Sequence, residues 1–397
     1  MCLLLKKRLH VNHVLLFLIF SPLLAFSQSV ANLNINYWYD TQSEVTFELK
    51  PIRLQNSIEV YYTLSLQLSS YTLDSYSITW EKRDYYSQRN SEVLTPEIQD
   101  LSTSSSRKGK LSFAVPEKPW LLMAKVKNNS TGHNWTYFSL IEPKFPVNGY
   151  LKSGSDVVTK NFVEGGKPYT VMGSGSEKPL NVFYYKERFP AGSPPFAEKE
   201  TKVDRFMFAD SSFSITSGSS LLLKKQGLYL IQEDTNSAEG FAFRAQDNTY
   251  PRFTKMDDLT EPLVFVCTKE EYDELLVANN EKPKFDKVIL DITKDRDRAK
   301  NFMRSYFKRV ESANYYFTSY KEGWKTDRGM IYLIFGVPDE VSRNDNNEIW
   351  YYKNFQSRFT FIKTGTVYDP NNYVLLRDKR FTEKWYNTID LWRKSRF

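Results

Sequence analysis

The chain has 397 residues, a length typical of two or three domains. Its 41% hydrophobic and 25% charged residues are typical of a globular protein, and an aromatic content of 16% suits a β-rich fold outside the cytoplasm. The net charge is +7, and without the three basic residues of the first 27 it is +7 − 3 = +4. A charge this small does not favour nucleic acid as a partner.

The first 27 residues are predicted to be a signal peptide. Residues 6–8, Lys-Lys-Arg, are positively charged, and the apolar stretch from 14 to 26 is short for a membrane span. The small residues Ala25 and Ser27 predict cleavage after Ser27, and a retained N-terminal anchor is the alternative. Cys2 precedes the apolar stretch, so this is not a lipoprotein signal. No later stretch is long enough to span a bilayer, and we expect a periplasmic or outer-membrane-associated protein.

Residues 28–143 show strong two-residue periodicity. Val45, Phe47 and Leu49 alternate with polar residues, and Ile78 and Trp80 repeat the pattern. This period is typical of half-buried strands, and turn-rich breaks separate them. The pattern predicts a β-sandwich-like domain over residues 28–143.

A Pro-rich linker at 143–146 precedes a second predicted β-rich domain over residues 147–258. Within it, the stretch Ala191–Phe196 predicts an exposed loop with an apolar tip, either a docking feature or a long turn. The predicted strands are Tyr169–Met172, Leu180–Lys186, Arg205–Phe208, Phe213–Thr216, Gly227–Gln232 and Phe241–Arg244.

Residues 262–397 differ in pattern and predict an α+β domain. Thr268 and Glu271 have the spacing of a capping box, and two apolar faces at helical spacing follow, over 285–292 and 299–310. Strands are predicted at 348–352, 359–362 and 373–376, with a closing helix around 385–392. The fold class is therefore multidomain: two β-sandwich-like all-β domains followed by a C-terminal α+β domain.

The stretch Gly323–Gly329, which we call the motif, is the most distinctive part of the chain. Trp324 predicts a buried anchor, and Thr326 and Asp327 predict a capped turn. Gly323 and Gly329 lie on either side of that turn, and each can take positive φ without strain.

After the motif comes the unbroken apolar run 330–335. A buried strand is preferred there over a turn of buried helix, although periodicity alone does not separate the two. Gly336 and Pro338 end the run.

The motif carries a resemblance to a known family. Gly-Trp-x-Thr-Asp at 323–327, then Arg-Gly, Gly-x-Pro-Asp-Glu at 336–340 and Ile-Trp-Tyr-Tyr at 349–352, resembles the GWxTD domain of Bacteroidota over roughly residues 265–397. That family has no assigned activity, so the resemblance implies a lineage and no mechanism. More weakly, residues 336–352 resemble the BamE/SmpA module of the outer-membrane assembly machinery, a helix pair on a three-stranded sheet that works by binding.

The chain lacks the residues that most metal, cofactor and catalytic sites require. The chain after Ser27 contains one cysteine, Cys267, and one histidine, His133, so we expect no metal and no cofactor. Asp327, Asp339 and Glu340 would support carboxylate catalysis if they converged, and otherwise cap a turn or face water. Residues 344–348 lack EF-hand spacing and predict a hairpin loop.

We therefore expect a non-enzymatic scaffold or adaptor that docks on a cell-envelope protein complex, with an exposed Arg328 beside the Trp324 anchor. The alternatives are a carboxylate-dependent hydrolase and a glycan-binding protein, both acting on envelope polysaccharide. A row of exposed aromatic rings would favour glycan binding, and a buried set would remove that alternative. The candidate interface or motif residues are Gly323, Trp324, Thr326, Asp327, Arg328, Gly329, Gly336, Pro338, Asp339 and Trp350.

Overall fold

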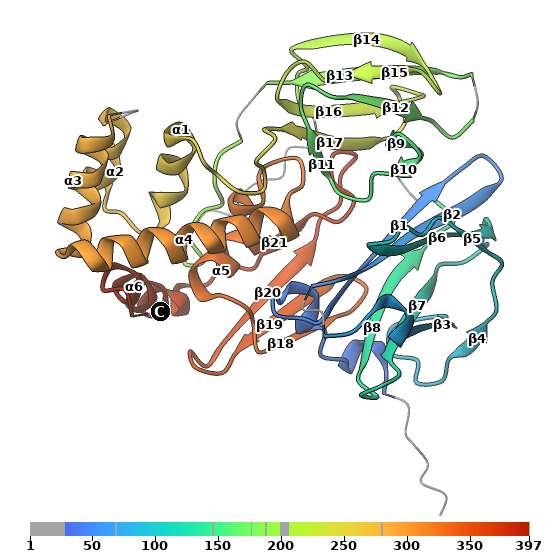
Figure 1. Cartoon of the computed structure of the whole chain (residues 1–397), viewed down its shortest axis with the longest axis horizontal. Helices are drawn as coiled ribbons and strands as arrows, with labels where there is room; N and C mark the ends of the chain where they lie inside the picture. Colours follow the sequence, from blue (N-terminus) through green and yellow to red (C-terminus); the bar gives the residue numbers. More distant parts are fainter. Residues whose placement is uncertain are drawn as a thin grey trace, which may run out of the picture.

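The computed structural model describes residues 28–67, 70–144, 147–175, 177–186, 189–198, 206–278 and 281–396. The predicted signal peptide therefore lies outside the described residues. Within the described ranges, no helix combines the length and the apolar character needed to cross a membrane. The fold is multidomain, with several antiparallel sheets followed by a C-terminal region rich in helices (Figure 1).

The N-terminal domain is a sandwich of two four-stranded sheets. Its core lies between the sheets, where apolar side chains from alternate strand positions meet, as the two-residue period predicts. One sheet has the order β1 (Val45–Arg53), β2 (Ser57–Leu66), β6 (Ser106–Ala114), β5 (Ile98–Asp100), and the other β4 (Glu92–Leu94), β3 (Tyr76–Arg83), β7 (Trp120–Asn128), β8 (Asn134–Ile141).

The middle domain also has two sheets, with antiparallel pairs apart from the parallel pair β11–β17. One sheet has the order β10 (Asp156–Val157), β9 (Tyr150–Ser153), β12 (Pro168–Met172), β15 (Ser220–Leu222). The other has the order β11 (Phe162–Glu164), β17 (Phe241–Gln246), β16 (Gly227–Gln232), β13 (Pro179–Tyr185), β14 (Ser211–Thr216).

The predicted strand Arg205–Phe208 is wrong over its described part. Phe206 is 93% exposed and Phe208 fully exposed, and residues 206–208 have no regular structure. Their alternation has the right period, but β14 begins only at Ser211 and no strand pairs with these residues. Arg205 lies outside the described residues.

The C-terminal region packs helices and a four-stranded antiparallel sheet around one core. The predicted capping box is confirmed, since Thr268 Oγ1 accepts from Glu271 N at 3.2 Å and Glu271 Oε2 accepts from Thr268 N at 2.8 Å. The α-helices are α1 (Met256–Thr260), α2 (Lys269–Val277), α3 (Lys282–Thr293), α4 (Arg296–Phe317), α5 (Asp327–Phe335) and α6 (Thr382–Arg393). The sheet has the order β18 (Glu340–Arg343), β19 (Asn347–Tyr352), β20 (Ser357–Lys363), β21 (Tyr373–Leu375). Short 3-10 helices are η1 (Val30–Asn32), η2 (Asn36–Tyr39), η3 (Leu73–Ser75), η4 (Glu261–Phe265), η5 (Gly323–Lys325) and η6 (Lys379–Phe381).

The apolar run 330–335 is the end of helix α5, so the preferred strand is wrong. Every residue from Gly329 to Phe335 is buried, which leaves no polar face to reveal a helical period. The helix begins because Thr326 caps it. It ends at Gly336, whose φ of 86° is outside the range that a helix allows.

The segment 28–40 crosses from the N-terminal domain to the C-terminal sheet. Ile35 N donates to Val341 O at 2.9 Å, and Val341 N donates to Asn34 Oδ1 at 2.9 Å. Val30, Ile35 and Tyr39 are buried in the same core as the C-terminal helices. This contact brings Tyr39 to the site described next.

Candidate functional site

The two glycines of the motif allow close backbone packing. A Cβ on Gly323 would lie 2.1 Å from the carbonyl oxygen of Ala313 on α4, and one on Gly329 would lie 1.8 Å from the carbonyl oxygen of Gly323. Neither glycine has positive φ, so the left-handed conformation that is open to glycine is not used at either position. Steric room against a neighbouring backbone is the reason for glycine at both positions.

Trp324 and Thr326 hold the motif in place on α4. The Trp324 ring is 2% exposed and packs edge-on against Phe265 at 5.9 Å between centroids, so the predicted buried anchor is confirmed. Its backbone N donates to Asn314 Oδ1 at 3.2 Å. The Thr326 hydroxyl accepts from Gly329 N at 3.0 Å and donates to Gly323 O at 2.7 Å, and it thereby caps α5.

Asp327 is a buried partner of Arg377. Its carboxylate accepts two hydrogen bonds from the Arg377 guanidinium, at 2.7 and 3.1 Å, and one from Leu375 N at 2.8 Å. The two side chains are 5% and 2% exposed. A bidentate pair of this kind has strong directional preference, so Asp327 fixes the start of α5 against β21.

The loop 189–196 of the middle domain covers this pair. Arg377 donates to Ser193 O at 2.9 Å, and Gly192 N donates to Lys325 O at 2.8 Å. Gly192 is so close that a Cβ there would lie 2.7 Å from Asp327 Oδ1. The predicted exposed loop is therefore wrong for Gly192 and Pro195, which are buried, because the loop packs onto the motif.

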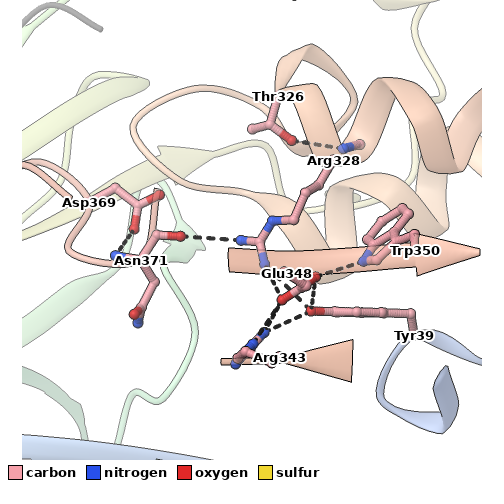
Figure 2. A network of polar contacts seen from close by, with 9 residues as sticks. Tyr39, Thr326, Arg328, Arg343, Glu348, Trp350, Asp369 and Asn371 are labelled. Carbon is pink, nitrogen blue, oxygen red and sulfur yellow. Dashed lines mark hydrogen bonds and ion pairs between the residues drawn. The ribbon is translucent and has the colours of Figure 1, made fainter. Parts of the chain in front are cut away.

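Arg328 is not the exposed side chain that was expected; it is 14% exposed and takes part in a buried polar network (Figure 2). Its guanidinium lies 3.4 Å from Glu348 Oε2 and donates to Asn371 O at 3.3 Å. Glu348 also accepts from Arg343 Nε at 2.8 Å and from the Tyr39 hydroxyl at 2.8 Å. The network therefore joins α5, two strands of the C-terminal sheet and the N-terminal segment.

The chemistry of this network centres on Glu348, which is fully buried. Burial by itself raises the pKa of Glu348, but Arg343 and Arg328 outweigh it and hold that pKa at about 2. Trp350 Nε1 adds a hydrogen bond of 2.8 Å to the same carboxylate. The predicted hairpin between β18 and β19 is confirmed, and Glu348 is a structural anion.

A second buried ion pair connects the residues before the motif to the middle domain. Arg244 on β17 contacts Glu322 at 3.1 Å and donates to Tyr320 O at 2.8 Å. Lys325 contacts Glu322 at 3.2 Å and Glu261 at 2.8 Å. Burial raises the pKa of Glu322, yet the cations Arg244 and Lys325 lower it to about 2.

The other predicted residues lie at the far end of α5. Gly336 O accepts from the Tyr352 hydroxyl at 2.8 Å, Pro338 is buried, and Asp339 is exposed and accepts from Lys353 N at 2.8 Å. Asp327 opens α5, and Asp339 follows its end, a separation of about 12 Å along the helix alone. The structure therefore does not bring these acids together.

Sequence reasoning missed the partners of the motif. Arg377 and Tyr39 have no local pattern that marks them, and Glu348 was predicted as a loop oxygen or the first residue of a strand, with no charged partner. Long-range packing pairs them with Asp327 and Arg328. Among the described residues, no group of three or more His, Cys, Asp or Glu side chains is placed to hold a metal ion.

These features define a multidomain, β-rich protein whose C-terminal α+β region is built around a buried Gly-Trp-Lys-Thr-Asp motif. Residues 227–394 match the family model of the GWxTD domain. The matched region begins at β16, so it includes Arg244 as well as the motif. No curated protein that was compared with the chain matches it significantly.

Proposed function

We propose that this protein is a non-enzymatic scaffold of the cell envelope, in which the motif holds the domains in a fixed arrangement. One observation carries the proposal: Asp327 is buried and Arg328 is mostly buried where the N-terminal segment, the middle domain and the C-terminal region meet. Each is tied to another part of the chain, Asp327 through Arg377 to Ser193 and Arg328 through Glu348 to Tyr39. A scaffold needs such rigidity to present its outer surfaces.

The hydrolase alternative has less support. It requires two acids that face each other across a cleft, but Asp327 is bonded to Arg377 and Asp339 lies beyond the opposite end of α5. The other candidate acid, Glu340, is exposed and lies 3.3 Å from Lys353. None of the three has a carboxylate partner.

The glycan-binding alternative, in its surface form, requires an exposed row of aromatic rings. Seven of the eight tryptophans are buried, and only Trp38 is partly exposed. Of the exposed aromatic residues, Phe206 and Phe208 lie together beside β14. Phenylalanine offers no hydrogen bond to a sugar, so this pair fits a protein surface better.

The proposed location is the periplasm or the inner face of the outer membrane, after cleavage behind Ser27. The likeness of residues 323–352 to proteins of Bacteroidota supports an envelope with two membranes. The resemblance of residues 336–352 to the BamE/SmpA module, which works by binding, favours a protein complex as the partner. Cell fractionation with a C-terminal tag, followed by N-terminal sequencing, tests both the cellular location and the cleavage site.

The scaffold role is tested by affinity purification of the tagged mature protein from its own envelope extract. The native protein is compared with a Phe206→Ser, Phe208→Ser variant, and Val277→Ser serves as a matched control because Val277 is 79% exposed elsewhere, on α2. We expect a defined membrane complex with the native protein and the control, and less of it with the double variant. Equal recovery of the complex with all three proteins would show that the complex binds a surface other than the one around Phe206 and Phe208. If nothing copurifies, the scaffold proposal fails.

A further inference from the structure

A cavity of about 340 Å³ lies where the three parts of the chain meet, and Arg328 is part of its wall. Its wall includes residues of η2 and β1, the stretch 159–162, the end of α4 and the loop between β20 and β21. The volume is at the lower end of the range of about 300–1,000 Å³ for small-molecule sites. None of the functions considered above uses this cavity.

Asp369 stands out in its wall. The residue is 6% exposed, and no described cation lies within ion-pair distance of its carboxylate. Its Oδ1 accepts a hydrogen bond from Asn371 N at 2.9 Å (Figure 2). Burial raises the pKa of Asp369 to about 6, although the charges of Arg328 and Lys363 and a hydrogen bond from Ser319 act to lower it. A buried carboxylate that no cation contacts directly is costly, and such groups are typical of binding sites.

The charges around the cavity balance when Asp369 and the Glu348 carboxylate behind the wall are both counted. Lys160 pairs with Glu48 and lies 3.7 Å from the centre of the Tyr315 ring, and Arg328 and Arg343 are both held by the Glu348 carboxylate behind the wall. The lining has four cationic side chains and three acidic ones, and Glu348 behind the wall is the fourth acid. The cations are Lys160, Arg328, Arg343 and Lys363, and the acids are Glu48, Asp345, Asp369 and Glu348.

Aromatic faces and neutral polar groups make up much of the remaining wall. Rings from η2, β8 and the end of α4 stand beside hydroxyl and amide groups of Ser139, Asn161 and Asn371. The aromatic members of the lining are Tyr37, Trp38, Tyr39, Phe47, Tyr86, Tyr137, Phe138, Phe162, Tyr315, Tyr316, Phe317 and Tyr373.

We propose that this cavity binds one neutral sugar ring, with Asp369 accepting hydrogen bonds from adjacent hydroxyl groups. A pyranose has an apolar C–H face that packs on an aromatic ring and a rim of hydroxyls that pair with carboxylate and amide groups. Balanced charge around the cavity disfavours a net cation or anion. Sugar binding goes beyond the proposed scaffold role. The two proposals are independent, so the failure of one does not overturn the other.

The cavity fits binding better than hydrolysis. A second acid of the wall, Glu48, is held by Lys160 and by the Thr159 hydroxyl. Burial raises the pKa of Glu48, but Lys160 outweighs it and keeps that pKa low. Asp369 is then the one lining acid in the described residues whose carboxylate is buried and has no cation bound to it. A single acid orients a sugar, whereas glycoside cleavage uses a pair.

The test is ligand-observed NMR and calorimetry on the mature protein with glucose and N-acetylglucosamine as probes. Glucuronate and glucosamine serve as the charged counterparts. Two variants address the cavity: Asp369→Asn keeps the shape of the side chain, and Ser139→Trp fills the space. Asp286→Asn is the matched control, because Asp286 is an exposed acid on α3, paired with Lys282. Thermal melts establish that each protein is folded.

We expect a neutral sugar to bind, with about tenfold or greater loss of affinity in Asp369→Asn, because a hydrogen bond to a charged group is lost. Ser139→Trp abolishes binding, and Asp286→Asn leaves it unchanged. Tighter binding of glucuronate or glucosamine than of glucose overturns the assignment of a neutral ligand. Absence of binding by the folded native protein, or binding that neither cavity variant weakens, overturns the site itself.

Discussion

At the scale of single residues, the motif is held in place by a buried ion pair. Asp327 and Arg377 are almost completely buried and satisfy each other with two hydrogen bonds. Removal of one partner of a buried pair leaves an uncompensated charge in the interior, which costs more than the pair contributed. Asp327 therefore stabilises the fold, although the sequence of the motif predicted a binding interface.

Asp327→Asn should lower the free energy of unfolding by about 3–5 kcal/mol, because the Arg377 guanidinium loses its carboxylate. Urea denaturation followed by fluorescence measures the change. Asp339→Asn is the control, since Asp339 is exposed and accepts one backbone hydrogen bond. Similar midpoints for the two variants would contradict the structural role of the buried pair.

Gly323→Ala should lower the free energy of unfolding by about 1–3 kcal/mol or more, since the new Cβ would lie 2.1 Å from the Ala313 carbonyl oxygen. Gly175→Ala is its control, because the added Cβ would meet only the end of the flexible Lys178 side chain, at 3.1 Å. The yield of soluble protein and the melting temperature report the difference. A normal melting temperature for Gly323→Ala would show that α4 and the motif are not so closely packed.

Asp369 gives a pH dependence of defined sign. Burial raises its pKa to about 6 from an ordinary 3.8, so the native state binds more protons than the unfolded state between these values. Its contribution to the free energy of unfolding therefore falls as pH rises from about 4 to about 6. Asp369→Asn should remove this slope and raise stability near neutral pH by on the order of 1–3 kcal/mol. Urea titrations of both proteins across that range measure it, and parallel profiles would refute it.

At the scale of elements, short irregular segments make the connections between domains. The segment 28–40 reaches the C-terminal sheet, and its Tyr39 hydroxyl donates to Glu348 and accepts from Arg343 at 2.9 Å. The loop 189–196 reaches the motif from the middle domain. Strands take part at their edges and through side chains, as Val341 of β18 does with Ile35 and Arg244 of β17 does with Glu322.

Tyr39→Phe should destabilise the protein by about 1–3 kcal/mol, since it leaves a buried carboxylate with one donor fewer. The matched control is Tyr85→Phe, because the Tyr85 side chain is 55% exposed. Differential scanning calorimetry compares the two. Equal melting temperatures would mean that the hydroxyl of Tyr39 is dispensable to the network around Arg328.

At the scale of the whole molecule, the C-terminal core includes residues from the N-terminal end of the described chain. Val30 and Ile35 are completely buried in the same core as α4, α5 and α6. Domains that share a core unfold together, whereas domains joined by linkers unfold separately. The segment and the C-terminal region should therefore behave as one cooperative unit.

Deletion of residues 28–40 should lower the melting temperature of the C-terminal region and leave the middle sandwich folded. Calorimetry should then show two transitions that are further apart than in the native protein. The deletion exposes β18, which loses the hydrogen bonds between Ile35 and Val341 and between Asn34 and Val341. An unchanged melting temperature of the C-terminal region would show that the segment does not contribute to its stability.

Patterns with a short range in the sequence predicted much of this architecture. The two-residue period marked the strands of the N-terminal sandwich, and the capping box at Thr268 and Glu271 marked the start of α2, because both depend on neighbours along the chain. The same range explains the error at 330–335, where burial on all sides removed the polar face that distinguishes a helix. The sequence also identified Trp324 and Asp327 as exceptional, but not what they contact.

Only the tertiary structure decided those contacts. Arg377 meets Asp327 across fifty positions of the chain, and Tyr39 meets Glu348 across about three hundred, so no local period connects them. Glycine at 323 and 329 is required by backbones that approach in three dimensions. Asp369 belongs to a cavity whose wall comes from three parts of the chain, and no local pattern marks it. Composition and period depend on local preferences, whereas burial and charge pairing depend on which distant groups share the same low-dielectric space.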